Sequence, residues 1–210
     1  MYLYTTMIAK TLCFILVLFY SHQAYGRTSQ GDVLEWQDYN PDSIPDDAIP
    51  SGETMDQEDI YIGLVHYSNE QFEGFIPTSI IAGQKCVHIA VGLEEIEKIC
   101  DNIKILVGKN DYLNKLFWED ARPSYFGSLF DSDDFRPVRA GWESHTLNYN
   151  SSLYLGRQYF SGRNWVGKIY NSHPKADENG DTVFVYEQYR SPDTVEIGKG
   201  VLFEVLLFRY

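Results

Sequence analysis

The sequence predicts an all-β protein in which two tandem antiparallel β repeats form a compact sandwich-like unit with little helix. Short segments rich in β-branched, aromatic and leucine residues recur along the chain between turn residues. A pattern that begins at Tyr61 also recurs at Tyr154, 93 residues later, without a gap. Glycines at fixed offsets in both copies indicate a duplicated backbone unit.

Residues 1–26 are predicted to be a secretory signal peptide. Lys10 precedes the apolar run 12–20, and small residues stand at Ala24 and Gly26, so cleavage is expected before Arg27. The run is shorter than the roughly 20 residues that a membrane span needs. We therefore expect a secreted, extracellular protein without membrane insertion, and residues 27–33 form an N-terminal segment ahead of the repeats.

Repeat 1 is assigned to residues 34–108. Strands are expected at 60–67, 74–80, 87–91 and 103–107, with a turn at 68–70 joining the first two. Residues 93–100 carry apolar side chains at helical spacing, which leaves a helical turn or a wide connection open. Residues 109–115 are assigned as the linker.

Repeat 2 is assigned to residues 116–210. Its expected strands are 153–160, 165–170, 182–186 and 201–208, with turns at 161–163 and 179–181. Residues 111–118 have the spacing of a short helix, and residues 124–134 are expected to be a loop.

The charge distribution limits the partners of the chain. The formal net charge is −13, and no Lys or Arg lies between residues 28 and 84. Binding to nucleic acid or to anionic membranes depends on Lys and Arg, so neither is expected. The acidic segment is either a solvated face or a docking surface for a cationic partner or Ca²⁺, although its spacing matches no calcium loop.

Cys86 and Cys100 are the two cysteines left after the leader is removed. An even pair in a secreted protein favours a disulfide, and two separately buried thiols are the alternative. Asn150 begins an Asn-Ser-Ser glycosylation sequon in a segment that we expect to be exposed.

The sequence gives little support for an enzyme. The histidines at positions 66, 88, 145 and 173 are dispersed without metal-ligand spacing, and no nucleophile motif is present. We expect no catalytic residues, no metal and no cofactor.

Several short motifs occur in the same order in both halves of the chain. Repeat 1 has Ile-Pro-Asp-Asp-Ala-Ile at 44–49, Ser-Gly at 51–52, Tyr-Ile-Gly at 61–63 and Ile-Lys-Ile-Leu-Val at 103–107. Repeat 2 has Ala-Gly-Trp-Glu at 140–143, Tyr-Leu-Gly-Arg at 154–157, Val-Gly-Lys at 166–168 and Phe-Glu-Val-Leu at 203–206. Together they resemble the DM-nine repeat family over nearly the whole mature chain. Trp36 and Trp118 stand where a tryptophan opens each repeat.

The resemblance implies a carbohydrate-binding function, because characterised members of the family include mannose-binding lectins. In those lectins an acid and a lysine hold the sugar, and the equivalent residues in repeat 2 are Glu143 and Lys168. Arg157 occupies the family's arginine position, and Trp142 is placed to offer an aromatic face to a sugar. For this role the side-chain tips of Glu143 and Lys168 must lie close together and face solvent.

Repeat 1 lacks the polar groups of this motif set. Thr54 stands at the acid position, Leu64 at the arginine position and, by the gap-free alignment, Phe75 at the lysine position. The leading hypothesis is therefore a secreted protein that binds mannose-type glycans through repeat 2. The alternative is a secreted protein-interaction or structural protein whose sugar sites have decayed and whose acidic repeat-1 surface does the binding. A homodimer is possible in either case.

Overall fold

The computed structural model describes residues 34–53, 57–93, 95–109, 113–146, 149–170, 183–191, 194–200 and 202–210. Apart from Leu34, these residues lie in one unit that spans Glu35–Tyr210. The expected leader, the segment 27–33 and the turn at 179–181 fall outside the described residues. No helix within the described ranges is long and apolar enough to cross a membrane.

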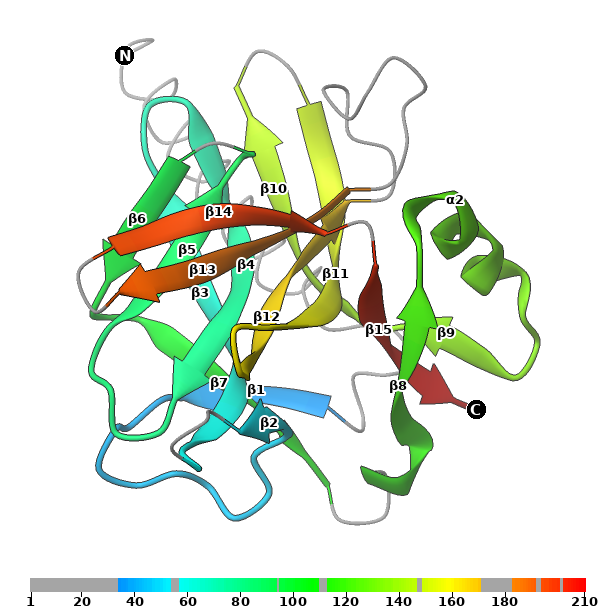
Figure 1. Ribbon diagram of the computed structural model, residues 1–210, viewed down its shortest axis with the longest axis horizontal. Helices are drawn as coiled ribbons and strands as arrows, with labels where there is room; N and C mark the ends of the chain where they lie inside the picture. Colours follow the sequence, from blue (N-terminus) through cyan, green and yellow to red (C-terminus); the bar gives the residue numbers. More distant parts are fainter. Residues whose placement is uncertain are drawn as a thin grey trace, which may run out of the picture. The chain divides into compact units, whose positions relative to one another are not determined.

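The described part of the chain is mostly β-strand and antiparallel, which confirms the predicted all-β, sandwich-like class (Figure 1). The strands of repeat 1 are β1 (Leu34–Asp38), β2 (Pro50–Glu53), β3 (Asp59–Ser68), β4 (Phe72–Ile81), β5 (Val87–Val91), β6 (Glu95–Ile99) and β7 (Ile103–Gly108).

Repeat 2 begins with strand β8 after a short 3-10 turn, η1 (Leu113–Lys115). Its elements are β8 (Leu116–Ala121), α2 (Pro123–Phe126), the 3-10 helix η2 (Gly127–Asp131), β9 (Phe135–Pro137), β10 (Arg139–His145), β11 (Tyr149–Phe160), β12 (Arg163–Tyr170), β13 (Val183–Ser191), β14 (Thr194–Gly200) and β15 (Phe203–Arg209).

One large sheet connects the two repeats. Its order is β1-β7-β3-β4-β10-β11-β12-β13-β14, with β2 paired to β3 and β15 paired to β11, β8 and β9. The repeats meet where β4 of repeat 1 pairs with β10 of repeat 2. Strands β5 and β6 form a separate two-stranded sheet.

Strands at the same position in the two repeats pair with their neighbours in the same register. Gly63 on β3 pairs with Ile105 on β7, and Gly156 on β11 pairs with Val205 on β15. The strands before them also match, because β2 has a register irregularity between Pro50 and Gly52, and β10 has one between Arg139 and Gly141. This agreement indicates a common backbone plan for the two repeats.

The gap-free alignment fails in the next strand. Gly156 pairs with Gly167 across the β11–β12 hairpin, whereas Gly63 pairs with Thr78 across the β3–β4 hairpin. The β3–β4 hairpin is therefore four residues longer, since 78 − 63 = 15 and 167 − 156 = 11. Ser79, and not Phe75, stands at the structural position of Lys168, so the sequence-based assignment of Phe75 to the lysine position is wrong.

Apolar side chains of the described residues form three buried clusters. One lies within repeat 1 and includes Val65, Ile76 and Ile105, and a second lies within repeat 2 and includes Phe184 and Val205. The third cluster joins the repeats. Its buried members are Ala90, Leu93, Leu153, Tyr170 and Val185.

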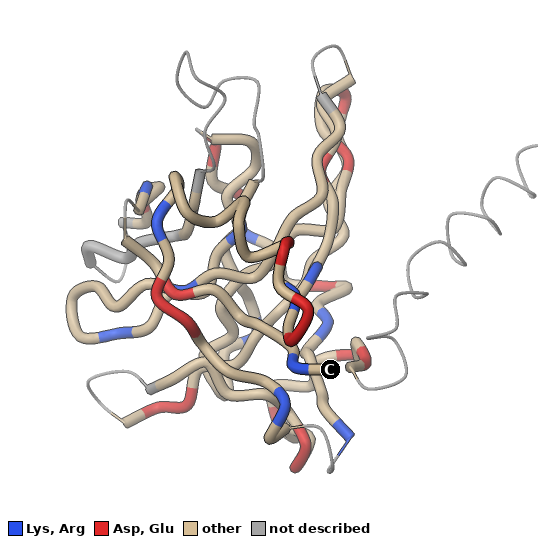
Figure 2. Tube along the Cα trace, turned by 90° about the vertical axis from the view of Figure 1, so that its right-hand side faces the viewer, with Lys and Arg blue, Asp and Glu red and all other residues tan. Residues whose placement is uncertain are grey.

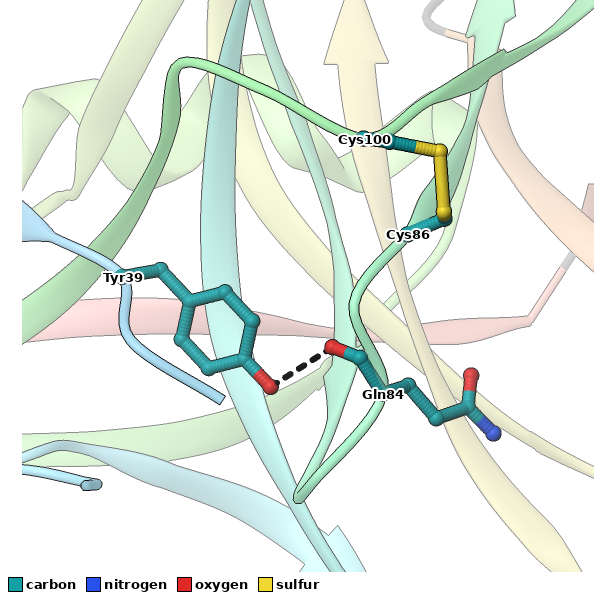
Figure 3. Close-up of a disulfide and its surroundings, with 4 residues drawn as sticks. All are labelled: Tyr39, Gln84, Cys86 and Cys100. Atoms are coloured by element: carbon teal, nitrogen blue, oxygen red, sulfur yellow. Dashed lines mark hydrogen bonds between the residues drawn. A yellow bond between two sulfur atoms is a disulfide. The ribbon is translucent and has the colours of Figure 1, made fainter. Parts of the chain in front are cut away.

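The predicted disulfide is confirmed, because Cys86 is bonded to Cys100. The bond closes the base of the β5–β6 hairpin, since the two cysteines flank its strands (Figure 3). Tyr39 donates a hydrogen bond of 2.8 Å to the carbonyl oxygen of Gln84, two residues before the disulfide. The base of this hairpin is thus held by the disulfide and by the hydrogen bond from Tyr39, the residue that follows β1.

The predicted strands are confirmed to within a few residues wherever the chain is described, but three other predictions need correction. Residues 93–100 contain strand β6 rather than a helical turn or a wide connection, because Glu95–Ile99 pair with β5. Residues 111–118 do not form one short helix, since β8 begins at Leu116 and pairs with β15. The expected loop at 124–134 contains α2 and η2, which bury Phe126 and Leu129 in the repeat-2 core.

Candidate functional site

Glu143 and Lys168 form a direct ion pair. Glu143 lies on β10 and Lys168 on β12, and the Lys168 Nζ is 2.6 Å from Glu143 Oε2. The side chains are 0 % and 1 % exposed, respectively. Sugar binding by this pair requires tips that lie close together and face solvent. The first condition is met, and the second is not met.

Further hydrogen bonds hold both charged groups. The backbone N–H of Gly92 donates to Glu143 Oε1, and the Lys168 ammonium donates to the carbonyl oxygen of Ala90. The Tyr170 hydroxyl lies within hydrogen-bond distance of Glu143 Oε2 and is 3.1 Å from the carbonyl oxygen of Gly92. Its single hydrogen can be given to one of these oxygens at a time. Both charges thus have partners in place of water.

A segment of repeat 1 covers this pair in repeat 2. Ala90 and Gly92 lie at the end of β5 and in the turn that follows, and Leu93 is buried in the cluster that joins the repeats. Gly92 has a φ of 59°, in the left-handed region where glycine is favoured. The tip of the β5–β6 hairpin is therefore the cover of the Glu143–Lys168 pair.

The surroundings of Glu143 act in opposite directions on its pKa. Burial is the largest effect and raises it, because a desolvated carboxylate is unfavourable. The Lys168 charge and the hydrogen bonds from Lys168, Tyr170 and Gly92 together outweigh burial and hold the pKa below its ordinary value. Glu143 is consequently ionised at neutral pH.

Trp142 lies on the opposite face of β10 from Glu143, because successive side chains of a strand alternate. It is opposite Phe75 of β4, and the two ring centroids are 6.4 Å apart. The structure therefore does not bring Trp142 into the surroundings of the Glu143–Lys168 pair.

Arg157 is held by a different set of partners. Its guanidinium donates two hydrogen bonds to Glu204 on β15, of 2.7 and 2.9 Å, and one of 2.6 Å to the carbonyl oxygen of Ser51 on β2. It also lies over the ring of Trp118, 4.4 Å from the centroid. Arg157 thus connects β11 and β15 of repeat 2 with β2 of repeat 1.

The equivalent positions of repeat 1 hold no such ion pair among the described residues. Thr54, at the acid position, falls outside the described residues. Leu64 is buried and lies opposite Lys104. Ser79, at the lysine position, accepts a hydrogen bond of 2.8 Å from the backbone N–H of Val166.

Sequence reasoning missed the other residues around the ion pair. Tyr170 follows Lys168 by two positions on the same strand, and this two-residue period was a usable signal. Ala90 and Gly92 contribute backbone groups from a distant part of the chain, and nothing in the local sequence indicates this. Within the described ranges, no group of three or more His, Cys, Asp or Glu side chains is arranged to hold a metal ion.

The predicted glycosylation site and two residues of the acidic segment are exposed. Asn150, the predicted glycosylation site, lies on β11 opposite Ser144, and its side chain is exposed. Glu58 and Asp59 of the acidic segment are also exposed, and Asp56 falls outside the described residues.

The fold and the site define an all-β protein built from two related β units, with an acid–lysine pair enclosed between them. A family model of the DM9 repeat matches residues 20–98. This match confirms the resemblance to the DM9 repeat family in the first half of the chain. No curated protein matches the chain.

Proposed function

We propose that this chain is a secreted carbohydrate-binding protein that recognises mannose-type glycans through repeat 2. The observation that supports the proposal most directly is the ion pair, since the acid and lysine of the DM9 motif set are 2.6 Å apart in repeat 2. The match of repeat 1 to the DM9 family supports the carbohydrate-binding class.

The chemistry of the pair suits a sugar. Adjacent hydroxyls of a pyranose can donate to the Glu143 carboxylate and accept from the Lys168 ammonium, and hydrogen bonds to charged groups are the stronger ones. Such binding needs no metal and involves no catalytic step. Because the side chains are buried, the Ala90–Gly92 segment must withdraw before a sugar can replace its backbone groups.

A glycan array followed by calorimetry with a mannoside tests this proposal. The variant is the double substitution Glu143→Gln/Lys168→Met, which removes both charges and leaves none unpaired. The matched control is Glu70→Gln/Lys85→Met, at two exposed positions of repeat 1. We expect mannose-type binding in the natural chain and in the control, and loss of binding in the double variant. Absence of a mannose-type signal, or its retention in the double variant, would refute the proposal.

The burial of the pair favours a second candidate, a protein-interaction role with decayed sugar sites. Glu143 and Lys168 already satisfy one another and are closed off from solvent. The exposed acids of repeat 1, such as Glu58 and Asp59, would then contact a cationic partner. In Figure 2, however, acidic positions of the described chain are spread over several separated places, with basic ones between them.

Salt-dependent pull-downs distinguish this candidate. Neutralising Asp56, Glu58 and Asp59 would abolish capture of a cationic partner, because the contact is electrostatic and screened by salt. Neutralising Asp131, Asp133 and Asp134 of repeat 2 serves as the matched control. Capture that survives the first set of substitutions would exclude the repeat-1 surface.

A further inference from the structure

An open pocket of about 750 Å³ lies on repeat 2 beside strands β8, β11 and β15 and the start of α2. Strands β8 and β15 and helix α2 lie near one another on the right in Figure 1, and β11 pairs with β15. Volumes of about 300–1,000 Å³ are typical of small-molecule sites. The lining residues are Asp120, Ala121, Arg122, Tyr125, Arg157, Gln158, Tyr159, Leu202, Phe203 and Glu204.

Two exposed tyrosines contribute to the lining of this pocket. Tyr125 comes from α2 and is 53 % exposed, and Tyr159 comes from β11 and is 67 % exposed. Exposed aromatic rings leave apolar surface in water, and that surface is available to the C–H face of a sugar ring, while the hydroxyl supplies a polar contact. Neither tyrosine is a member of the three buried clusters of the described residues.

A row of charged side chains crosses three strands of the same pocket. Asp120 on β8 lies opposite Glu204 on β15, and Glu204 lies opposite Arg157 on β11. Arg157 is fixed by its two bonds to Glu204, so this part of the row is ordered before any ligand arrives. Glu204 keeps 30 % of its side chain exposed. The row thus offers carboxylate acceptors and guanidinium donors to a ligand.

The charges of the lining balance one another. Two carboxylates, Asp120 and Glu204, stand beside two guanidinium groups, Arg122 and Arg157, so the formal charges cancel. An anionic or cationic ligand gains little net attraction from such a set, whereas a neutral ligand rich in hydroxyls can use both kinds of group. Gln158 also belongs to the lining, but its Oε1 is buried and does not face the pocket.

We propose that this pocket is a saccharide site in its own right, separate from the Glu143–Lys168 pair, and that it takes a neutral sugar stacked on Tyr159 or Tyr125. Arg157 then contacts the ligand in this pocket, next to Glu204, and not beside Lys168. This site requires no movement of the β5–β6 hairpin, because the pocket is already open.

The test is an NMR titration of the ¹⁵N-labelled protein with methyl α-mannoside and methyl β-glucoside, which reports on each site separately. We expect amide shifts at Gln158, Tyr159 and Glu204, and affinity about tenfold weaker in Tyr159→Ala. Asp120→Asn tests the polar row and is expected to weaken binding as well. Tyr210→Ala is the matched control, because Tyr210 is 54 % exposed and does not line this pocket.

Each outcome separates this site from the buried pair. Pocket shifts that persist in Glu143→Gln/Lys168→Met support the pocket, whatever happens at the pair. Shifts confined to the amides of Gly92 and Lys168 support the buried pair and overturn the pocket proposal. No shift with either sugar, or equal loss in Tyr210→Ala, also overturns it.

Discussion

Glu143 and Lys168 are both removed from water, and their contact with each other and a few hydrogen bonds replace the lost hydration. Taking two charges out of water costs several kcal/mol per ion, and their attraction repays this only with good geometry. Here the geometry includes a 2.6 Å contact and three further partner residues, Gly92, Ala90 and Tyr170. The pair is therefore sensitive to loss of one member and much less sensitive to loss of both.

At the residue scale, we predict that Lys168→Met lowers the free energy of unfolding by about 3–5 kcal/mol, because it leaves a buried carboxylate without its counter-charge. Adding Glu143→Gln restores most of this loss. Urea unfolding of the natural chain, the two single variants and the double variant measures these free energies as a double-mutant cycle. Lys199→Met, at an exposed lysine, is the control and should change little. Additive effects of the two substitutions would contradict the prediction.

The same pair predicts a pH dependence. The folded-state pKa of Glu143 is lowered from its unfolded value, so its stabilising contribution is present above the unfolded pKa and is lost as the pH falls through the folded pKa. We expect the natural chain to lose unfolding free energy below about pH 4.5 more steeply than the double variant does. Urea unfolding at a series of pH values checks this, and parallel curves would refute it.

At the scale of elements, the β5–β6 hairpin is the structure that closes the ion pair. It forms its own small sheet, its base is tied by Cys86–Cys100, and its tip supplies the Gly92 N–H to Glu143. The disulfide at the base limits the motion of the whole hairpin, and therefore also the motion of its tip. The disulfide and the site are thus physically linked although they share no residue.

We predict that Cys86→Ser/Cys100→Ser lowers the free energy of unfolding by about 3 kcal/mol, as expected for a closed loop of about 15 residues. Hydrogen exchange at the Gly92 amide should become faster, since the hairpin tip is less restrained. The amide of Val166, bonded to Ser79 between β12 and β4, is an internal control. Unchanged protection at Gly92 would show that the disulfide does not hold the cover.

At the scale of the whole unit, the two repeats cannot be separated without breaking hydrogen bonds. Strand β10 of repeat 2 pairs with β4 of repeat 1, and Gly74 on β4 has no room for a Cβ because a Cβ would lie 2.4 Å from the carbonyl oxygen of Trp142. Arg157 donates to Ser51 across the same boundary. One buried apolar cluster is also shared by both repeats.

We therefore predict that neither residues 27–108 nor residues 109–210 fold alone, because each fragment exposes half of the shared cluster and an unpaired strand edge. Two-dimensional amide NMR should show narrow dispersion for each fragment and wide dispersion for residues 27–210. A dispersed spectrum from either fragment alone would contradict this prediction.

Features that depend on local pattern could be predicted from the amino-acid sequence alone. Alternation and turn residues predicted the all-β class and strands such as β3 and β12, cysteine parity predicted Cys86–Cys100, and motif order pointed to Glu143 with Lys168 and to the DM9 repeat. Only the tertiary structure decided that the pair is buried, because the backbone that covers it comes from the other repeat. It also decided that Ser79, not Phe75, is the counterpart of Lys168, because hairpin length sets strand register and a gap-free alignment cannot register four added residues.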